Sequence, residues 1–534
     1  MQEKMKINNV VALLVLLQLC QNAVLSISST SCPPLCQCFS ATTVICSDPL
    51  IKALPADIPS QATALIVIAS GLRRITIQEH LGNLTKLVFL NNPVENVSHD
   101  AFKSLMSLEE LEISGSHFLV LEAGTFNKLD KLTKLLLNNN KITLLAPSIF
   151  DSLEKLETLQ LRGNMLTNLH RDIFHKLYNL QELNLASNKL PTIHTSKLSK
   201  LKKLDLGLNQ ITCLAVDTFR GNPQLQILSL KGNQIAQLTP GIFSQLDNLK
   251  ELNLRGNKIS TLSAGLFPSN LKKLMLRGNS LVQLSSVAFT GLHNLTHLDL
   301  SQNLLSSLPA ELFHNLSSLE HLDLSENTLQ ELASTVFRGL LQISVIDLQK
   351  NNLTSLEADL FTDQGQMSRL NLARNRLENL PDGVFEPLDF ECLLQLHGNP
   401  WLCDCDLMYL HEWLLFYSKT VADLSQVYCA NPQPLRGMSL TTMNKEQLVC
   451  VNRSISETRN SINQTTSTDS DRQCSLQEAS GIIVVKCKLM KCTDLKLDVY
   501  FHQSDGRPLN YTLTEPWPES VQCFNGTVIL TVFP

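Results

Sequence analysis

Hydrophobic and polar positions follow one phrase along most of the chain, L-x-x-L-x-L-x-x-N, in which three leucines precede an asparagine. The segments 132–140 and 156–164 are two successive copies of it. The residues that end successive copies, here called the asparagine marks, lie 24 residues apart, except for steps of 21 residues after Asn188 and 22 residues after Asn257. The last position of the phrase, or its equivalent, is occupied by Asn92, Ser116, Asn140, Asn164, Asn188, Asn209, Asn233, Asn257, Asn279, Asn303, Asn327, Asn351, Asn375 and Asn399.

This phrase is typical of leucine-rich repeats, each of which adds one short strand and one return segment. It predicts an α/β repeat fold, a curved solenoid with a parallel β-sheet on its concave face. Alternate strand residues face the same side, so the leucines are expected to point inward. The asparagine is expected to bond to backbone groups in the turn, because an unmet buried polar group costs about 1–3 kcal/mol.

A phenylalanine stands ten residues after most of the asparagine marks and is predicted to fill the convex half of the core. Glu391 stands where a buried leucine is expected, with Phe390 beside it as a replacement. The phenylalanines are Phe102, Phe126, Phe150, Phe174, Phe219, Phe243, Phe267, Phe289, Phe313, Phe337, Phe361 and Phe385.

The regions outside the repeats differ in composition. Two lysines precede an apolar run at 10–19, and small residues follow near Ser26, which is typical of a cleaved signal peptide. Apolar alternation ends after residue 450 and returns near residue 473. The predicted regions are a signal peptide at 1–26, an N-terminal cysteine cap at 27–60, about 13 to 14 repeats at 61–398, a C-terminal cysteine cap at 399–450, a linker at 451–472 and a small disulfide-linked β module at 473–534.

Twelve cysteines form three groups of four, before the repeats, after them and in the C-terminal module. Even-numbered clusters in a secreted chain favour disulfides, and no histidine lies within 32–46 to favour zinc there. Cys213 and Cys392 lie inside repeats and are predicted to be free thiols, with a pairing between them left open. The groups are Cys32, Cys36, Cys38 and Cys46; Cys403, Cys405, Cys429 and Cys450; and Cys474, Cys487, Cys492 and Cys523.

The signal peptide predicts a secreted, extracellular chain, and no later apolar run is long enough to span a membrane. The net charge of −5 gives no support for binding to nucleic acid or to an acidic membrane surface. Exposed sequons in a secreted chain are expected to carry N-linked glycan. The sequons begin at Asn83, Asn96, Asn294, Asn315, Asn352, Asn452, Asn463, Asn510 and Asn525.

The residue between the two inner leucines of each strand is expected to face the concave side. In three successive repeats this residue is an aspartate, and we call Asp299, Asp323 and Asp347 the acidic ladder. Lys231, Arg255 and Arg277 form a basic ladder two positions over. The pattern allows two interpretations, a face that orients a binding partner and an ordinary solvated face on which the carboxylates keep their usual pKa values.

The chain carries no recognised catalytic motif. None of the 13 histidines opens a zinc-peptidase spacing, and the sequence has neither a G-x-S-x-G elbow nor a phosphate-binding glycine loop. Asp and His in register beside the acidic ladder, with His297, Glu320 and His321, suit a metal ion, but repeats commonly present such residues without one. We therefore predict no catalytic residue, no cofactor and no metal.

Several segments together resemble the non-catalytic subunits of carboxypeptidase N. The resemblance runs from the first cap to the C-terminal four-cysteine module, which generic repeat proteins lack. The segments are 32–38, 45–47, the irregular copy at 108–118, 396–401, 444–450 and the module after the second cap.

The resemblance implies a glycosylated plasma protein that binds and stabilises a separate catalytic zinc carboxypeptidase subunit in a hetero-oligomer. Resemblance to other repeat caps implies the pairs Cys32–Cys38, Cys36–Cys46, Cys403–Cys429 and Cys405–Cys450. A different class of function is an extracellular recognition or matrix-binding protein that works alone, and a third is an enzyme, which the histidine spacings disfavour. Purification together with a metallocarboxypeptidase would distinguish the carboxypeptidase-binding subunit from the recognition or matrix-binding protein.

Overall fold

A computed structural model describes residues 32–450 except 41, 196, 197, 390 and 423, together with the backbone of six strands between residues 474 and 532. The chain divides into a first compact unit that ends at Leu448 and a second that begins at Val449. The predicted signal peptide, the predicted linker and Phe390 lie outside the described residues.

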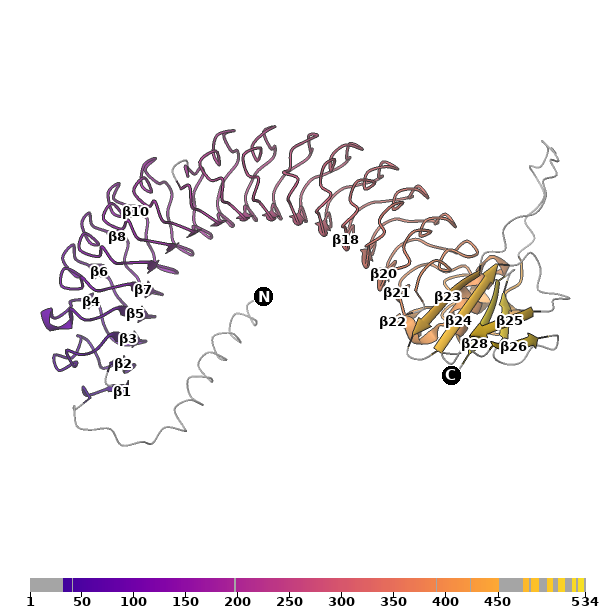
Figure 1. Cartoon of the computed structure of the whole chain (residues 1–534), viewed down its shortest axis with the longest axis horizontal. Coiled ribbons are helices and arrows are strands. Elements are labelled where there is room, and N and C mark those ends of the chain that lie inside the picture. The colour runs from indigo at the N-terminus through magenta and orange to yellow at the C-terminus, as the bar shows by residue number, and fades with distance from the viewer. Residues whose placement is uncertain are drawn as a thin grey trace. The chain divides into compact units, whose positions relative to one another are not determined.

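The repeats of the first unit form one sheet of short strands, in which each strand pairs in parallel with that of the next repeat. Figure 1 shows these strands along the inner side of an arc, with the return segments on the outer side. The strands are β2 (Thr43–Cys46), β3 (Ala64–Ile68), β5 (Lys86–Leu90), β7 (Glu110–Ser114), β9 (Lys134–Leu136), β11 (Thr158–Gln160), β12 (Glu182–Asn184), β13 (Lys203–Asp205), β14 (Ile227–Ser229), β15 (Glu251–Asn253), β16 (Lys273–Met275), β17 (His297–Asp299), β18 (His321–Asp323), β19 (Val345–Asp347), β20 (Arg369–Asn371), β21 (Leu393–Gln395) and β22 (Val421–Ala422).

The register keeps equivalent positions of the phrase side by side. Leu159 of β11 pairs with Leu183 of β12, and both side chains are fully buried, whereas their strand neighbours are only half-buried. Short bridges recur on the return segments, where β4 (Arg74–Ile75) pairs with β6 (Asn96–Val97) and β8 (Val120–Leu121) with β10 (Leu144–Leu145). The predicted leucine-rich-repeat solenoid with a parallel concave sheet is confirmed.

The asparagine of each phrase bonds the turn of its own repeat to the neighbouring repeats. Asn257, which is buried, donates from Nδ2 to the carbonyl of Leu254 at 2.9 Å and to that of Leu230, one repeat earlier, at 3.0 Å. Its Oδ1 accepts from the backbone N–H of Ile235 at 3.1 Å. Three buried backbone groups therefore depend on one side chain, which explains why the position tolerates so few residue types.

The residue before each asparagine turns the chain with a positive φ, 55° at Asn139 and 72° at Gly163. Glycine and asparagine adopt this left-handed conformation at low cost. The turn brings the backbone out of the strand so that the next side chain, the asparagine, points back into the repeat.

Most of the phenylalanines form a stack on the convex half of the core, with ring centroids 6.0–6.4 Å apart in adjacent repeats. The 21-residue repeat has no phenylalanine, and Leu198 is buried there instead. Beside it the buried Thr195 donates from Oγ1 to Oδ1 of Asn222 at 2.7 Å, and Asn222 donates to the Thr195 carbonyl at 2.9 Å. A buried polar pair therefore closes the convex side where the repeat is short.

Disulfide-linked caps lie at both ends of the solenoid. In the first, β1 (Cys36–Ser40) pairs antiparallel with β2, and disulfides join Cys32 to Cys38 and Cys36 to Cys46. In the second, a disulfide joins Cys403 to Cys429, and Cys405 and Cys450 are also disulfide-bonded. The described helices are η1 (Glu79–Leu81), η2 (Cys405–Leu407), α2 (Met408–Phe416), η3 (Ser418–Thr420), η4 (Leu424–Gln426), η5 (Gln433–Leu435) and η6 (Lys445–Gln447).

Two cysteines inside the repeats are free thiols, with Cys213 exposed and Cys392 buried. Glu391, which stands at the first leucine position of the phrase, is exposed, and the neighbouring Cys392 is buried. Burial, followed by the charge of Asp389, raises the pKa of the Cys392 thiol to about 12, so it serves as a small apolar side chain.

The second unit contains a four-stranded antiparallel sheet in the order β23-β24-β28-β27 and the hairpin of β25 with β26. The backbone register places residue Cys474 opposite Cys487, while Cys492 lies outside the described residues. The strands are β23 (Cys474–Ala479), β24 (Ile482–Lys488), β25 (Leu497–His502), β26 (Pro508–Leu513), β27 (Val521–Phe524) and β28 (Thr527–Val532).

Candidate binding face

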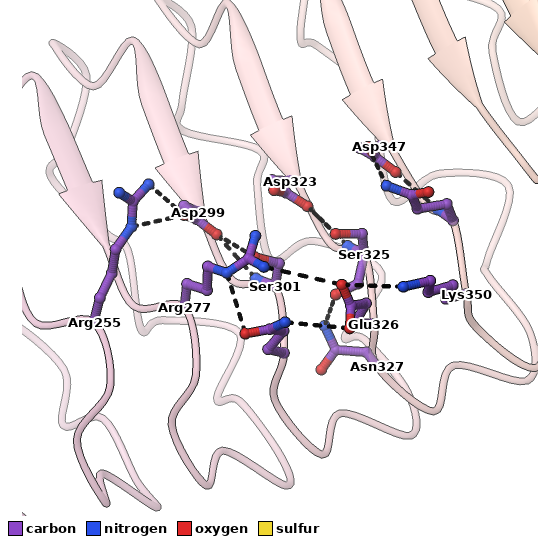
Figure 2. A network of polar contacts seen from close by, with 12 residues as sticks. Arg255, Arg277, Asp299, Ser301, Asp323, Ser325, Glu326, Asn327, Asp347 and Lys350 are labelled. Carbon is purple, nitrogen blue, oxygen red and sulfur yellow. Dashed lines mark hydrogen bonds and ion pairs between the residues drawn. The ribbon is translucent and has the colours of Figure 1, made fainter. Parts of the chain in front are cut away.

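The acidic ladder lies on three adjacent strands, as its spacing predicts. Asp299 of β17 pairs in register with Asp323 of β18, which pairs with Asp347 of β19. Neighbouring strands are about 4.8 Å apart, so three like charges follow one another along the sheet. Figure 2 shows the three carboxylates side by side on the ends of their strands.

Each aspartate caps the turn that follows its own strand. Asp299 and Asp323 accept at Oδ1 from the backbone N–H and the hydroxyl of the serine two residues later, Ser301 and Ser325, with the hydroxyl contacts at 2.6 Å. Asp347 accepts from the backbone N–H of Gln349 at 2.9 Å. The same contact recurs where this position is occupied by Asn184, Asp205, Asn253 and Asn371.

The expectation of a solvated acidic ladder is therefore wrong in one respect. Asp299 is only 9% exposed, and Asp323 and Asp347 are half-buried. These carboxylates hold the turns together because a short acceptor here satisfies backbone N–H groups that the sheet leaves unpaired. A reversal of all three charges is consequently expected to disturb folding as well as any binding.

The two ladders are joined by an ion pair. Arg255, which follows β15, reaches across β16 and donates from Nε at 3.0 Å and from Nη2 at 2.7 Å to Oδ2 of Asp299. The Arg255 side chain keeps 45% of its surface exposed, whereas that of Asp299 keeps 13%. The cation is thus the part of this pair that a partner can reach.

A second chain of contacts runs parallel to the first (Figure 2). Arg277 donates from Nε to Oε1 of Gln302 at 3.2 Å, and Gln302 donates to Oε2 of Glu326 at 3.2 Å. Glu326 also lies 3.5 Å from Nζ of Lys350 and 3.9 Å from Nη2 of Arg277. One carboxylate therefore holds two cations from repeats on either side of it.

The carboxyl groups of Asp347 and Glu326 have shifted pKa values. Burial raises the pKa of Asp347, and the charge of Asp323 raises it further against the hydrogen bonds from Gln349 and Asn371. The hydrogen bond from Gln302 lowers the pKa of Glu326, with the charge of Lys350 adding to it. The expectation that all these groups keep their usual pKa values does not hold for Asp347.

Residues just before the asparagine marks belong to this face although the search of the strands did not single them out. Gln302, Glu326 and Lys350 each precede an asparagine mark and have a positive φ of 53–55°. A search down that column of the repeat would have found them. Lys231, the first member of the basic ladder, follows β14 and is half-buried, outside the two chains of contacts.

A pair of histidines stands in register beside the acidic ladder. His297 of β17 and His321 of β18 stack with ring centroids 4.3 Å apart and an interplanar angle of 7°. Burial, then the charges of His321 and Lys273, lowers the pKa of His297. The neutral form of the ring is therefore the favoured one at neutral pH.

Five of the predicted glycosylation positions lie in the described residues. Asn83, Asn96, Asn294 and Asn315 are exposed and Asn352 is half-buried, so their occupancy stays a prediction. Asn452, Asn463 and Asn525 lie outside the described residues, and Asn510 lies in β26, where the backbone alone is described.

Among the described residues, none of the helices combines the length and the apolar character needed to cross a lipid bilayer. Disulfides of the kind found in both caps form and persist in oxidising compartments, which indicates an extracellular chain.

Comparison with known proteins gives matches to the repeats. The leucine rich repeat family matches residues 82–142, 106–166, 130–190, 155–211, 191–235, 223–268, 269–329, 303–344, 322–377 and 342–400. The chain is 34% identical over 156 residues to carboxypeptidase N subunit 2 of Homo sapiens, covering 26% of this chain and 27% of that protein. It is 35% identical over 156 residues to the same subunit of Mus musculus, covering 27% and 28%.

The aligned part thus spans about a quarter of the length of these curated relatives. A solved structure of a leucine-rich repeat protein from Leptospira interrogans matches with a TM-score of 0.60 and 26% identity, covering 70% of this chain and 92% of that one. This broader match is a likeness of repeat architecture.

Proposed function

Because this chain belongs to the leucine-rich repeat family, we propose that it acts by binding, as a non-catalytic subunit that holds and stabilises a catalytic zinc carboxypeptidase. The observation that carries the proposal is the likeness to carboxypeptidase N subunit 2 in two species, at 34% and 35% identity over 156 residues. The proposed complex is a hetero-oligomer, with neither nucleic acid nor membrane as a partner.

The concave face offers a surface suited to such binding. Arg255, Arg277 and Lys350 keep 40–45% of their side-chain surface exposed, whereas their carboxylate partners Asp299 and Glu326 keep 13% and 33%. The cations are held in place before any partner arrives, so little side-chain entropy is lost on binding. We infer that the partner presents acidic side chains to these three residues.

The test is affinity purification of the full chain from plasma or from cells that also express a secreted zinc carboxypeptidase, followed by mass spectrometry. We expect the enzyme to be recovered with the chain and to lose activity more slowly on heating when it is bound. A chain that reproducibly purifies without a metallocarboxypeptidase, and that fails to protect one, would contradict the proposal.

Charge reversal locates the interface within the same experiment. Arg277→Glu with Lys350→Glu should weaken binding and lower the association rate, and the wild-type rate should fall as salt rises. The matched control is Arg220→Glu with Arg338→Glu, which reverses two exposed cations on the return segments. Equal binding by both double variants would place the interface away from the concave face.

The second candidate is an extracellular recognition or matrix-binding protein that works alone. The observation that favours it is the short extent of the likeness to carboxypeptidase N subunit 2, about a quarter of each chain. A purified chain with no enzyme partner, but with saturable binding to a matrix component or a cell surface, would support this candidate.

We also propose that the chain is secreted into blood plasma and glycosylated at exposed sequons. Its proposed regions are a signal peptide at 1–26, caps at 27–60 and 399–450 around repeats at 61–398, a linker at 451–472 and a disulfide-linked module at 473–534. Intact-mass measurement of the chain isolated from plasma, before and after enzymatic removal of N-linked glycan, tests glycosylation and shows at which residue the secreted chain begins.

A further inference from the structure

Two histidines and a glutamate on the concave face come together with the donor types that transition metals prefer. One ligand atom each from His297, Glu320 and His321 lies within 4.8 Å of the others. In a tetrahedral zinc site with bonds of about 2.0–2.2 Å, ligand atoms are about 3.4 Å apart. The two rings are stacked in parallel, so the exposed His321 must tilt out of the stack for both lone pairs to meet one ion, while the exposed Glu320 rotates toward it.

Hydrogen bonds of Thr296 bear on which nitrogen of His297 can meet a metal. The Thr296 hydroxyl donates its only proton to the backbone carbonyl of Lys272, at 3.1 Å. Nδ1 of His297 lies 2.8 Å from the same oxygen, and a hydroxyl that donates to the carbonyl accepts from Nδ1. In this arrangement the neutral ring carries its proton on Nδ1, and the lone pair on Nε2 is available to a metal.

This arrangement is the one that metal-binding histidines use elsewhere, where the second ring nitrogen donates to a fixed oxygen and so sets the tautomer. We propose that His297, Glu320 and His321 bind one divalent transition-metal ion of the zinc class, with water in the remaining position. Two imidazoles and one carboxylate favour zinc over calcium or magnesium, which take oxygen ligands.

The residues in register on the two neighbouring strands border this site. On one side Lys273 is in register with His297, and its Nζ lies 3.3 Å from Oε1 of Glu251. On the other side Val345 is in register with His321 and offers no donor. The ion therefore joins two repeats, β17 to β18, within the solenoid itself.

The experiment is a titration of Zn²⁺ into the purified full chain, prepared without a polyhistidine tag and treated with chelator, with heat release and bound metal both measured. We expect a saturable site with one zinc per chain that is lost in the double variant His297→Gln with His321→Gln. Glu320→Gln and Thr296→Val should each weaken binding by about tenfold or more, since ligand-orienting partners have effects of that size.

The matched control is His99→Gln, which removes an exposed histidine beside a carboxylate, Glu122, at 3.8 Å. It should bind zinc as the wild type does, and circular dichroism should show that all variants keep the fold. If the double variant folds poorly, the visible spectrum of bound Co²⁺ in wild type and in Thr296→Val gives an independent test of imidazole ligation. Zinc binding equal in wild type and double variant, or a Co²⁺ spectrum without nitrogen ligation, overturns the proposal.

Discussion

Arg255 and Asp299, 44 residues apart in sequence, form a two-donor ion pair across an intervening strand. The pair joins a cation of the basic ladder to the member of the acidic ladder that lies two strands further along. A contact of this reach couples three repeats, as does the approach of Arg277 to Glu326 across β17.

The first prediction concerns that coupling. Arg255→Ala should lower the free energy of unfolding by about 1.5–3 kcal/mol, the usual value of hydrogen bonds to a charged group, because Asp299 is left buried without its cation. Asp299→Asn should lower the free energy of unfolding by less in the Arg255→Ala background than it does in the wild type. Denaturant unfolding of the two single variants and the double variant gives the coupling energy, and strict additivity would show that the pair contributes nothing.

The second prediction separates a buried asparagine from an exposed one. Asn257→Ala leaves three buried backbone groups without a partner and should lower the free energy of unfolding by about 2 kcal/mol or more. Asn248→Ala removes one exposed hydrogen bond, to the Pro223 carbonyl at 2.9 Å. This variant should change the free energy of unfolding by at most about 0.5 kcal/mol. Thermal unfolding of both variants checks the ranking, and similar losses would contradict the role given to the phrase asparagine.

The repeat phrase predicts the fold because its leucines and asparagines are set by short-range geometry. The period alone places Leu159 beside Leu183 and Asp299 beside Asp323. It does not predict how charges on different columns pair, since that depends on side-chain reach across strands. Arg255 contacts Asp299, while Arg277 reaches Glu326 through Gln302, and no spacing rule distinguishes the two.

The repeat pattern also does not predict which side chains of the concave face are buried. An aspartate between two leucines was expected to be solvated, but the serine two residues later turns Asp299 into a turn cap. The same sequence relation, Asp-x-Ser, holds at Asp323 with Ser325, so the signal was present in the sequence. The column before the asparagine marks contains Glu326, but its contacts with Lys350 and Arg277 depend on where the turns place the side chains.

The third prediction concerns the C-terminal cap. Cys403→Ser with Cys429→Ser opens a loop of 26 residues, whose closure contributes about 3.5 kcal/mol by the chain-entropy argument. Because repeats stabilise one another through nearest neighbours, the loss should appear first in the last repeats. Hydrogen exchange should rise in β20 and β21 while β11 stays protected. Uniform exchange along the solenoid, or no change at all, would contradict local stabilisation by the cap.

The last prediction concerns the repulsion within the acidic ladder. Burial raises the pKa of Asp347 and the charge of Asp323 adds to it, so the folded chain binds that proton more tightly than the unfolded chain does. The charged form of Asp347 therefore costs stability at neutral pH, and the cost disappears as pH falls below the unfolded value of about 3.9. Like charges directly opposite each other on neighbouring strands destabilise by about 0.2–1 kcal/mol.

Asp323→Asn removes this repulsion but keeps an Oδ1 that can accept from the N–H and hydroxyl of Ser325. We expect the variant to be more stable than wild type at pH 7.5, by up to about 1 kcal/mol, with the gain vanishing near pH 4. The matched control is Asp205→Asn, which keeps the same bond to Gly207 but lies between Asn184 and Ser229, with no acid beside it. Thermal unfolding across this pH range measures the stability of both variants. If Asp205→Asn stabilises the chain as much as Asp323→Asn does, the repulsion between Asp323 and Asp347 is not the source of the added stability.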